Sequence, residues 1–285
     1  MTRLFVLGNA SIDVTLRVPA LPRAGETLMA HGVVRSPGGK GLNQAVMAAR
    51  AGACVHFCAP LGREPETALV LDALQAEGFA SLALIEAEQP TDLSTLLVAD
   101  GGENVIISTG DCADAVTPEI AADFVAAMRP EDWLLIQGNL SEAATYAGCL
   151  GARRIIFNTA PIRWISQRIL QRATVVIANE GEAERIAVSA DPAGLGGRIG
   201  IVTLGARGCV VAEGGGMRAF PAQAVASVDT TGAGDIFCGV LAAGLVGGAA
   251  LDQAIGRAQR AAAIGVARAG CFPSFPSRAE LAALG

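Results

Sequence analysis

Residues 229–235 read Asp-Thr-Thr-Gly-Ala-Gly-Asp and run directly into an apolar stretch that begins at Ile236. The three small residues Gly232, Ala233 and Gly234 allow several backbone N–H groups to approach one point. A helix that begins there presents its unpaired amides and the positive end of its dipole to the same ligand, which favours an anion. This stretch therefore predicts an anion site at the N-terminus of a helix.

Asp235 ends the stretch, at the mouth of the predicted anion site. A carboxylate beside a phosphate is repulsive unless it serves as a base. In that role Asp235 takes the proton from a hydroxyl group while this hydroxyl attacks a phosphoryl group. Asp is also a common N-cap residue of helices. The spacing alone leaves both interpretations open.

Two widespread nucleotide-binding patterns are missing from the sequence. Gly39-Lys40-Gly41 is not followed by Ser or Thr, so it does not complete a P-loop, and no GxGxxG pattern occurs. These absences disfavour a P-loop nucleotidase and a Rossmann dehydrogenase. The remaining interpretation is phosphoryl transfer by a protein with a different fold.

Lys40 is the single lysine among 21 basic residues, and it lies in the turn Gly38-Gly39-Lys40-Gly41. A planar guanidinium cannot take the place of a compact, mobile ammonium group. A need for such a group at this turn would explain why an arginine-rich chain keeps one lysine here. Chance is the alternative explanation.

The composition is typical of a compact globular protein, and the charge distribution favours a small-molecule substrate. Of the 285 residues, 52% are hydrophobic and 17% are charged. The net charge of −6, without a basic run, argues against nucleic acid and anionic membranes as partners. The longest uncharged stretch, residues 236–251, is shorter than the about 20 residues of a membrane span.

The seven cysteines indicate a reducing compartment. They lie mostly in apolar runs and include no CxxC pair, so a disulfide framework or a zinc site is not expected. The N-terminal residues enter a strand pattern without the charged and apolar regions of an export signal. We therefore expect a cytoplasmic protein.

Short apolar strands alternate with helical patterns along most of the chain, which is typical of an α/β fold with a mostly parallel central sheet and helices on both faces. The expected strands are residues 4–7, 55–59, 82–85, 133–137, 154–157, 174–178 and 201–204. The expected helices are residues 41–51, 64–77, 118–128, 141–150, 180–188, 235–246, 251–269 and 277–284.

Two regions break this alternation and predict a small antiparallel β lid built from about residues 14–34 and 93–108. Its expected strands are residues 14–18, 27–34, 93–99 and 104–108, with a hairpin turn at Asp100–Glu103. These strands carry apolar residues on both faces. One face is expected to cover the substrate and exclude water, and the other to need a partner surface. The whole chain, 1–285, then forms one domain with a lid.

Gly38-Gly39-Lys40-Gly41-Leu42-Asn43-Gln44-Ala45 resembles the N-terminal signature of the ribokinase-like (PfkB) carbohydrate kinases, and residues 229–235 resemble their C-terminal signature. Further motifs follow in the order and approximate spacing of this family. They are residues 8–13, 25–27, 102–104, 158–161, 179–184 and 203–208. The resemblance covers nearly the whole chain, is closest to ribokinases, and implies an ATP-dependent kinase of a sugar hydroxyl.

The resemblance assigns the phosphoryl-transfer end of the site. Asp235 matches the family's catalytic base, which also binds the substrate. Gly232, Ala233 and Gly234 match the anion hole for the charge that develops on the transferred group.

The sugar end is assigned in the same way. Asp13 matches a carboxylate that accepts hydrogen bonds from two sugar hydroxyls. Gly39, Lys40 and Asn43 match the turn that contacts the sugar. Ser11 and Asn139 stand where ribokinases usually carry Asn and Glu. These two changes are expected to alter which hydroxyl pattern is preferred, because an amide adds donors where a carboxylate only accepts.

The resemblance also implies Mg²⁺ and ATP. Asn179-x-x-Glu182 resembles the motif that organises Mg²⁺, with Glu182 acting through water because Mg²⁺ keeps much of its hydration shell. A helix N-cap followed by a first-turn acid is the alternative. The residues that match the ATP site are Asn179, Thr203, Gly205, Arg207, Gly208, Gly234 and Gln259. An ordinary surface cation is the alternative for Arg207, and a helix-face polar residue for Gln259.

A monovalent cation, K⁺, is implied by a further set of matches, mostly through backbone carbonyls. The set is Asp229, Thr231, Gly265, Arg268, Gly270 and Ser274. Family resemblance also implies a homodimer in which two lids pack against each other.

The function expected from all of this is an ATP-dependent kinase of a primary hydroxyl on a pentose or related sugar. A kinase of a nucleoside, a hexose or another alcohol is the alternative among enzymes. A catalytically silent regulator that binds a nucleotide or a sugar is the alternative from another class, because a fold does not dictate function.

Overall fold

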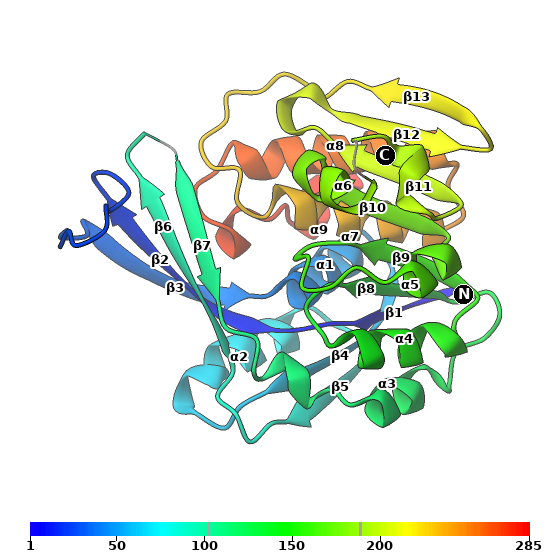
Figure 1. Ribbon diagram of the computed structural model, residues 1–285, viewed down its shortest axis with the longest axis horizontal. Helices are drawn as coiled ribbons and strands as arrows, with labels where there is room; N and C mark the ends of the chain where they lie inside the picture. The colour runs from blue at the N-terminus through cyan, green and yellow to red at the C-terminus, as the bar shows by residue number, and fades with distance from the viewer. Residues whose placement is uncertain (102, 188–189) are drawn as a thin grey trace.

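The computed structural model describes residues 1–101, 103–187 and 190–285. Its largest element is a nine-stranded sheet in the order β13-β12-β11-β10-β9-β8-β1-β4-β5 (Figure 1). The parallel strands are β1 (Arg3–Leu7), β4 (Cys54–Leu61), β5 (Ser81–Glu86), β8 (Trp133–Gln137), β9 (Arg154–Asn158), β10 (Val175–Asn179) and β11 (Ile199–Thr203). Two antiparallel strands, β12 (Cys209–Glu213) and β13 (Gly216–Phe220), extend one edge.

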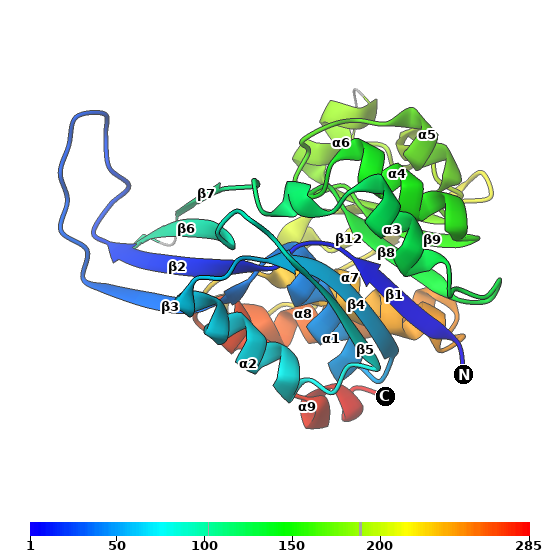
Figure 2. The ribbon, with the colours of Figure 1, turned by 90° about the horizontal axis from the view of Figure 1, so that it is seen from below.

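Helices cover both faces of this sheet (Figure 2). One layer contains α1 (Lys40–Arg50), α2 (Ala68–Ala76), α7 (Ala233–Val246), α8 (Leu251–Val266) and α9 (Arg278–Ala282). The other contains α3 (Pro118–Val125), α4 (Glu142–Gly151), α5 (Gln167–Arg172) and α6 (Glu180–Ala187). Residues of β1 alternate between the two cores, with Leu4 and Val6 in one and Phe5 and Leu7 in the other. The predicted α/β fold is confirmed.

The described helices and strands differ from the predicted ones mainly at their ends. The helix predicted to reach Ala269 ends at Val266, and the one predicted to reach Met128 ends at Val125. The predicted end of the helix at Val188 lies outside the described residues. Strands β12 and β13 and helix α5 were not predicted. Short 3₁₀ turns occur at Pro65–Thr67, Ala113–Ala115, Pro192–Leu195, Gly205–Arg207 and Phe272–Ser274.

No helix in the described ranges combines the length and the apolar character needed to cross a bilayer. Residues 236–246 of the longest uncharged stretch instead belong to α7, which is buried between α1 and α8.

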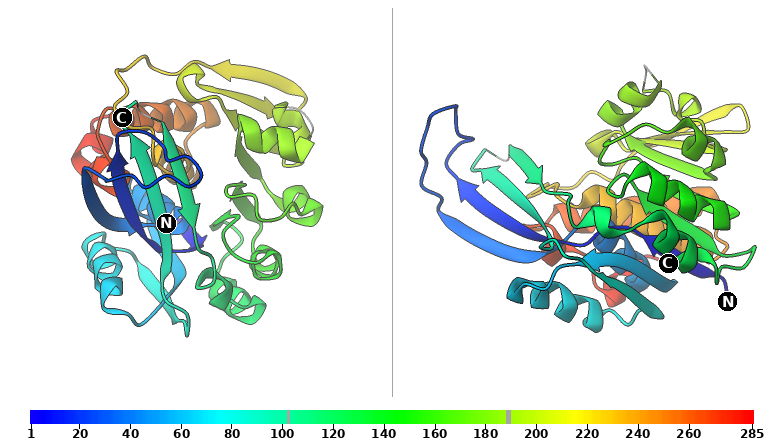
Figure 3. Two further views of the ribbon diagram at one scale, coloured as in Figure 1. Left: turned by 60° about the vertical axis from the view of Figure 1, so that its left-hand side comes forward. Right: turned by 60° about the horizontal axis from the view of Figure 1, so that its bottom comes forward.

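A second, four-stranded sheet projects from the main body as the predicted lid (Figure 3). Its order is β3-β2-β6-β7, from β2 (Ser11–Val18), β3 (Gly32–Gly38), β6 (Asp92–Ala99) and β7 (Asn104–Ser108). The outer pairs, β2 with β3 and β6 with β7, are antiparallel as predicted, whereas the central pair β2 with β6 is parallel. That parallel pair joins the two lid segments, which lie far apart in the sequence.

One predicted lid strand is shifted. The strand expected at residues 27–34 begins at Gly32 and continues to Gly38, and the chain before it forms an irregular loop. The Glu26 carboxylate accepts a hydrogen bond from the Arg23 backbone N–H, so this part of the chain closes a local turn instead of pairing with β2. The predicted hairpin turn at Asp100–Glu103 includes Gly102, which lies outside the described residues.

Candidate active site

A cavity of about 600 Å³ opens between the lid and the carboxyl ends of β1 and β8. Strand β1 pairs with β4 on one side and β8 on the other, so the chain reverses its direction of winding here. Such switch points are the usual ligand-binding position in open α/β sheets. Every residue predicted for the sugar end lines this cavity, together with part of the predicted anion hole. These residues are Ser11, Asp13, Gly39, Lys40, Asn43, Asn139, Gly232 and Asp235.

Asp235 is the third residue of α7 and is only 5% exposed. Its Oδ2 accepts a hydrogen bond from Nδ2 of Asn43 at 3.1 Å, and its Oδ1 accepts one from Nε2 of Gln44 at 2.9 Å. The N-cap position belongs to Gly232, whose φ of 81° is in the left-handed region. Asp235 is therefore not the N-cap residue, because its carboxylate is bonded to side chains of α1.

Gly232 also has a steric role. A Cβ atom at this position would meet Sγ of Cys271 and Cε1 of Phe275 at 2.8 Å. Only glycine combines the left-handed φ with this close approach. Of the predicted anion hole, only Gly232 lines the cavity, and the Ala233 N–H donates to the Thr230 carbonyl oxygen at 3.2 Å.

Lys40 is the first residue of α1, and its Nζ lies 3.8 Å from Oδ1 of Asp235. The Asp235 carboxylate raises the pKa of Lys40, so the side chain is a cation at neutral pH. Its half-buried ammonium group faces the cavity beside the predicted base. The turn before Lys40 depends on Gly39, which has a φ of 93° and would place a Cβ 2.9 Å from Cα of Ala10.

Asp13 on β2 is buried at the lid side of the cavity. The pKa of Asp13 is raised to about 6, mainly by burial; the hydrogen bond from Oγ of Ser11 at 3.0 Å opposes this shift, and the nearby charge of Asp235 adds to it. The carboxyl group is thus poised to change charge just below neutral pH.

Asn9 was not predicted individually, although it lies in the recognised segment 8–13. Its Oδ1 accepts a hydrogen bond from the Gly41 N–H at 3.2 Å, and its carbonyl oxygen accepts one from the Leu42 N–H at 2.9 Å. These bonds fix the start of α1 to the end of β1. Asn9 therefore positions Lys40 as well as lining the cavity.

Arg163 is a second cavity residue that the sequence argument missed. Both of its Nη atoms donate to the Asp114 carboxylate, at 3.1 and 3.0 Å, and Nη1 also donates to the Asn139 carbonyl oxygen. Oδ1 of Asn139 is buried and has no hydrogen-bond partner within the described residues. This corner of the cavity thus contains an ion pair and a buried acceptor to which no described residue donates. The signal for Arg163 was its place two residues after Pro161 in a recognised motif.

None of the residues predicted for the nucleotide lines this cavity: Asn179 and Thr203 end β10 and β11, Gly234 is the second residue of α7, and Gln259 lies on α8. Asn179 pairs in register with Thr203. Asn179 and Glu182 form reciprocal hydrogen bonds, from Nδ2 to Oε1 at 2.8 Å and from the Glu182 N–H to Oδ1 at 2.8 Å. This is the geometry of the helix-capping alternative. Oγ1 of Thr159 also donates to Oε2 of Glu182 at 3.0 Å.

Gly205, Arg207 and Gly208 lie in the β11–β12 turn. Gly205 and Gly208 both have positive φ there, and between them Arg207 donates two hydrogen bonds to the Glu180 carboxylate, at 2.8 and 2.7 Å. Nε2 of Gln259 donates to the Phe220 carbonyl oxygen at 2.8 Å. That bond ties α8 to β13 and corresponds to the alternative of a structural polar residue.

The residues predicted around a monovalent cation are brought together only in part. The Asp229 carboxylate accepts hydrogen bonds from the Thr231 N–H at 2.9 Å and the Gly270 N–H at 3.0 Å, so two distant loops meet there. A Cβ on Gly265 would lie 3.9 Å from the Ser274 carbonyl oxygen. The Arg268 side chain instead pairs with Glu280, and the guanidinium lowers the pKa of that carboxyl to about 2.

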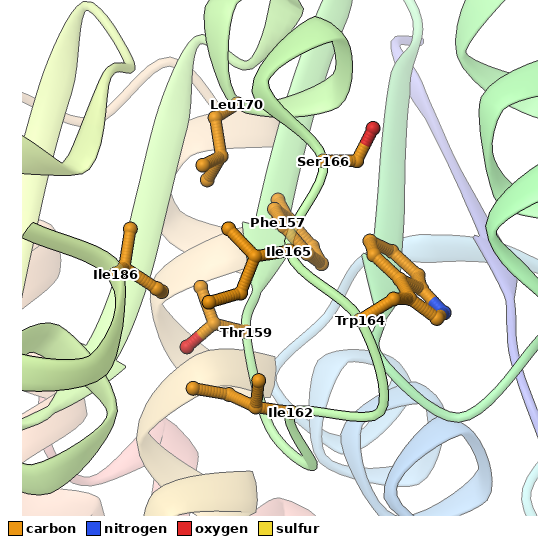
Figure 4. Close-up of a pocket in the computed structure, with 8 residues that line it drawn as sticks. All are labelled: Phe157, Thr159, Ile162, Trp164, Ile165, Ser166, Leu170 and Ile186. Atoms are coloured by element: carbon orange, nitrogen blue, oxygen red, sulfur yellow. The ribbon is translucent and has the colours of Figure 1, made fainter.

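A second pocket lies on the opposite side of β9, between the β9–α5 loop and α6 (Figure 4). Phe157, Ile162, Ile165 and Ile186 surround it, and its volume is about 10 Å³. Such a space holds no more than a water molecule. The sugar-sized site is the cavity under the lid.

Comparisons with known proteins agree with this geometry. The family model described as "pfkB family carbohydrate kinase" matches residues 1–278. The chain is 31% identical to the ribokinase of Bacillus subtilis, over 99% of this chain and 98% of that protein, and 30% identical to the ribokinase of Haemophilus influenzae, over 97% and 96%. The crystal structure of Thermotoga maritima ribokinase matches with a TM-score of 0.89 at 28% identity, covering 100% of this chain and 99% of that one. The chain belongs to the pfkB family of carbohydrate kinases and is an ATP-dependent carbohydrate kinase.

Proposed function

We propose that this kinase transfers the terminal phosphoryl group of ATP to a primary hydroxyl of a pentose or related sugar, with Asp235 as the base. The observation that carries the proposal is the position of Asp235, which lines the sugar-sized cavity and lies in the first turn of α7, next to Gly232, which lines the same cavity. The names of the two bacterial relatives, both ribokinases, support a pentose as the acceptor.

In this mechanism the sugar is held from two sides. The ionised Asp13 accepts hydrogen bonds from neighbouring hydroxyls, and Oδ1 of Asn43, which is buried without a partner in the described part of the chain, accepts one from below. The reacting hydroxyl donates its proton to Asp235 as its oxygen attacks phosphorus. Holding both reactants in line supplies much of the rate enhancement.

Negative charge develops on the transferred group during this step. The backbone N–H groups of Gly232 and Gly234 at the start of α7 are proposed to receive it, together with that of Ala233, which also donates to the Thr230 carbonyl oxygen at 3.2 Å. The ammonium group of Lys40, beside Asp235, adds a full positive charge on the same side. Both are fixed before the reaction, so little reorganisation is needed in the transition state.

The nucleotide is proposed to bind at the ends of β10 and β11. The residues involved are Asn179, Thr203, Gly205, Arg207, Gly208 and Gly234. Gln259 is proposed to act at this site only through its hydrogen bond to β13, which holds the neighbouring β12–β13 hairpin.

Glu182 is proposed to assist Mg²⁺ binding through water. No group of three or more His, Cys, Asp or Glu side chains in residues 1–101, 103–187 and 190–285 could hold a metal ion. Glu182 already accepts three hydrogen bonds, so a lone pair remains for a metal-bound water rather than for direct ligation. That donor set fits an ion that keeps most of its waters and takes its other ligands from phosphates. Bound there, Mg²⁺ would neutralise phosphate charge.

A monovalent cation, K⁺, is proposed between the loops that Asp229 joins. Oγ1 of Thr231 is buried without a partner in the described part of the chain, which leaves an oxygen free for a cation. The proposed ligands come from Asp229, Thr231, Gly265, Arg268, Gly270 and Ser274, mostly through carbonyl oxygens. For Arg268 only its carbonyl is available, since its side chain pairs with Glu280.

A nucleoside is the second candidate substrate. Above the polar residues Asp13, Ser94 and Ser108, the lid side of the cavity continues with Leu96 and Ile106. This apolar wall could pack against a base attached to the sugar. A hexose or another alcohol, and a silent regulator, are the remaining alternatives, and the retained Asp235 argues against the last.

The lid is proposed to form a homodimer. Leu16 pairs with Val33 and with Leu97, and Leu97 pairs with Val105, so an apolar row crosses the lid on the face turned away from the cavity. Ile107 on the same face is 65% exposed. A second copy of the lid would cover this surface. The seven free cysteines support a reducing compartment, and we propose the cytoplasm.

The experiment that tests the function measures ADP formation with a panel of pentoses, hexoses and nucleosides, for the wild type and for Asp235→Asn. A pentose should give the highest kcat/KM. Asp235→Asn should lower kcat by about 100-fold or more, the lower range for loss of a general base, while ATP still binds. Turnover near wild type in this variant would exclude Asp235 as the base, and inactivity with every acceptor would favour the regulator.

A further inference from the structure

Two buried amide side chains form a hydrogen-bonded chain that ends on Asp235, and a third amide donates to Asp235 separately. Nε2 of Gln137 donates to Oε1 of Gln44 at 2.9 Å, and Nε2 of Gln44 donates to Oδ1 of Asp235 at 2.9 Å. The neighbouring residue Asn43 donates to the other carboxylate oxygen at 3.1 Å. Both oxygens of Asp235 are thus held by amides from consecutive residues of α1.

The direction of this chain follows from the charge at its end. An ionised carboxylate can only accept hydrogen bonds, so Gln44 must turn its NH₂ group toward Asp235. Its carbonyl oxygen then faces the opposite way and must accept, which Nε2 of Gln137 satisfies. The same rule turns Oδ1 of Asn43 away from Asp235, where it is free to accept from the substrate. One carboxylate therefore orients three amides.

Gln44 and Gln137 lie behind the cavity rather than on its surface. Gln44 is 0% exposed and Gln137 is 1% exposed, whereas Asn43 and Asp235 line the cavity. Oε1 of Gln137 has no hydrogen-bond partner within the described residues. A buried amide oxygen without a hydrogen-bond partner lowers the stability of the folded protein. Such unpaired polar atoms often occur at functional sites.

We propose that Gln44 and Gln137 are positioning residues that hold the Asp235 carboxylate against rotation, so that its free lone pairs stay directed at the substrate hydroxyl. This inference rests on the proposed role of Asp235 as the base. Gln137 acts through Gln44, because it extends from β8 and keeps the Gln44 amide from turning over. Neither residue contacts the reacting atoms.

The first test compares Gln44→Met, Gln137→Met and the double variant, with ribose or the fastest acceptor of the panel. We expect each single variant to lower kcat by about 10- to 100-fold, as for a displaced catalytic group, while both KM values stay within about twofold. The double variant should be no slower than Gln44→Met, since both changes break one chain. Independent, multiplying losses would contradict the proposal.

A matched control removes a buried hydrogen bond elsewhere. Oγ1 of Thr145 in α4 donates to the Ser141 carbonyl oxygen at 2.9 Å, and Thr145 is fully buried. Thr145→Val should lower the melting temperature without changing kcat. If Gln44→Met does not fold, Gln137→Met carries the same test, and an unchanged kcat in the folded variant overturns the proposal.

A second test uses Gln44→Glu. When protonated, the new carboxyl group can still donate to Asp235 and accept from Gln137. At about pH 6 and saturating sugar, kcat should exceed that of Gln44→Met by about tenfold or more, the scale of one restored charge-assisted hydrogen bond. Equal kcat values for these two variants would overturn the proposal. The other titratable groups around Asp235 are Lys40 on α1, Asp13 on β2, Cys238 on α7 and Cys271, so kcat of both variants is compared at the same pH.

Asp235→Asn in the same series separates the two proposals. If it turns over at near wild-type rate, the function proposed for Asp235 fails, and the chain of amides has no base to position. If it is slow while Gln44→Met and Gln137→Met keep full kcat, the base assignment survives and only the positioning role is wrong.

Discussion

Asp13 and Asp235 are both buried carboxylates in one cavity, but their neighbours differ. Asp235 accepts hydrogen bonds from two amides and lies beside Lys40, whereas the side chain of Asp13 has a hydrogen bond from the Ser11 hydroxyl. Burial consequently dominates at Asp13 and raises its pKa to about 6. The proposed sugar-holding residue therefore titrates close to the physiological range.

The first prediction at this scale concerns sugar affinity. Only ionised Asp13 accepts hydrogen bonds from two hydroxyls, so the Kd for ribose should rise by about tenfold per pH unit below about pH 6. Calorimetric titration at pH 5 and pH 7.5 measures this. Asp13→Asn should bind weakly at both pH values, and a wild-type Kd that does not change over this range would contradict the role.

The second prediction concerns stability. The folded carboxyl of Asp13 has a pKa of about 6 against an ordinary value of 3.8, so the folded state binds the proton more tightly than the unfolded state. The free energy of unfolding should therefore fall as pH rises from about 4 to about 6. Asp13→Asn should remove this loss and be more stable at pH 7 by on the order of 2–3 kcal/mol.

Urea denaturation at several pH values checks this prediction. Asp123→Asn, which changes an exposed carboxylate on α3, is the control and should leave the free energy of unfolding nearly unchanged. An Asp13→Asn variant less stable than the wild type at pH 7 would show that the buried charge is not the dominant cost.

The sequence predicted the residues that touch the cavity better than those that support them. Asp235 stands in a short motif whose chemistry can be interpreted locally, and the family resemblance assigned Lys40 and Asn43. Gln44 lies 191 residues from Asp235 and 93 from Gln137, and no periodicity links positions so far apart. Supporting contacts of this kind depend on packing between elements, which a sequence pattern does not encode.

Among the helices, α1 and α7 make the contact on which the site depends. A Cβ at Gly239 of α7 would lie 2.6 Å from the Gln44 carbonyl oxygen and 2.6 Å from Cβ of Met47. The two helix backbones thus approach closely one turn beyond Asp235. This approach lets amides on α1 reach a carboxylate on α7.

We predict that Gly239→Ala separates these helices. The free energy of unfolding should fall by on the order of 1–3 kcal/mol, as for an overpacked core. In addition, kcat should drop more than KM changes, because the amide bonds to Asp235 lengthen. Thermal melts and steady-state kinetics measure the two effects.

Gly256→Ala on α8 is the matched helix control. A Cβ there would meet only Nη1 of Arg260, at 3.4 Å. This variant should gain up to about 1 kcal/mol from helix propensity and keep its kcat. Equal kinetics for the two alanine variants would mean that the α1–α7 spacing does not control the base.

Two strands, the buried β8 and the exposed β7, were predicted with the same bounds that the structure has. The bounds of β8, Trp133–Gln137, could be predicted because strands that are buried on both faces of a parallel sheet form continuous apolar runs. The exposed edge strand β13 and the loop before β3 were missed or shifted. Their residues are bonded locally or face solvent, so hydrophobic periodicity carries little information about them.

At the scale of the whole molecule, the lid prediction can be tested by assembly. Light scattering at micromolar concentration should show a dimer for the wild type and a monomer for Ile107→Asp, because a buried charge without a partner opposes association. The monomer should also lose activity, since the lid is then supported only at its base. A wild-type monomer with full activity would rule out the dimer.

Leu150→Asp provides the control for this experiment. Leu150 on α4 is also an exposed apolar residue, at 57%, but it lies on the main body and not on the lid. This variant should remain a dimer with full activity. Dissociation by both changes would point to a general loss of solubility instead of a specific lid contact.

The pairing of α1 with α7 also has a consequence for how the protein is made. Gln44 and Asp235 are 191 residues apart, so at about 5–20 residues per second a ribosome needs roughly 10 to 40 seconds between them. During that interval the apolar side of β1 and β4 waits for a helix that has not yet been synthesised. A chain released before α7 would carry every proposed sugar contact on the lid and α1 but no base. Such a fragment would expose the apolar surface that α7 normally covers. Chaperones and proteases would therefore bind it, and it would have no kinase activity.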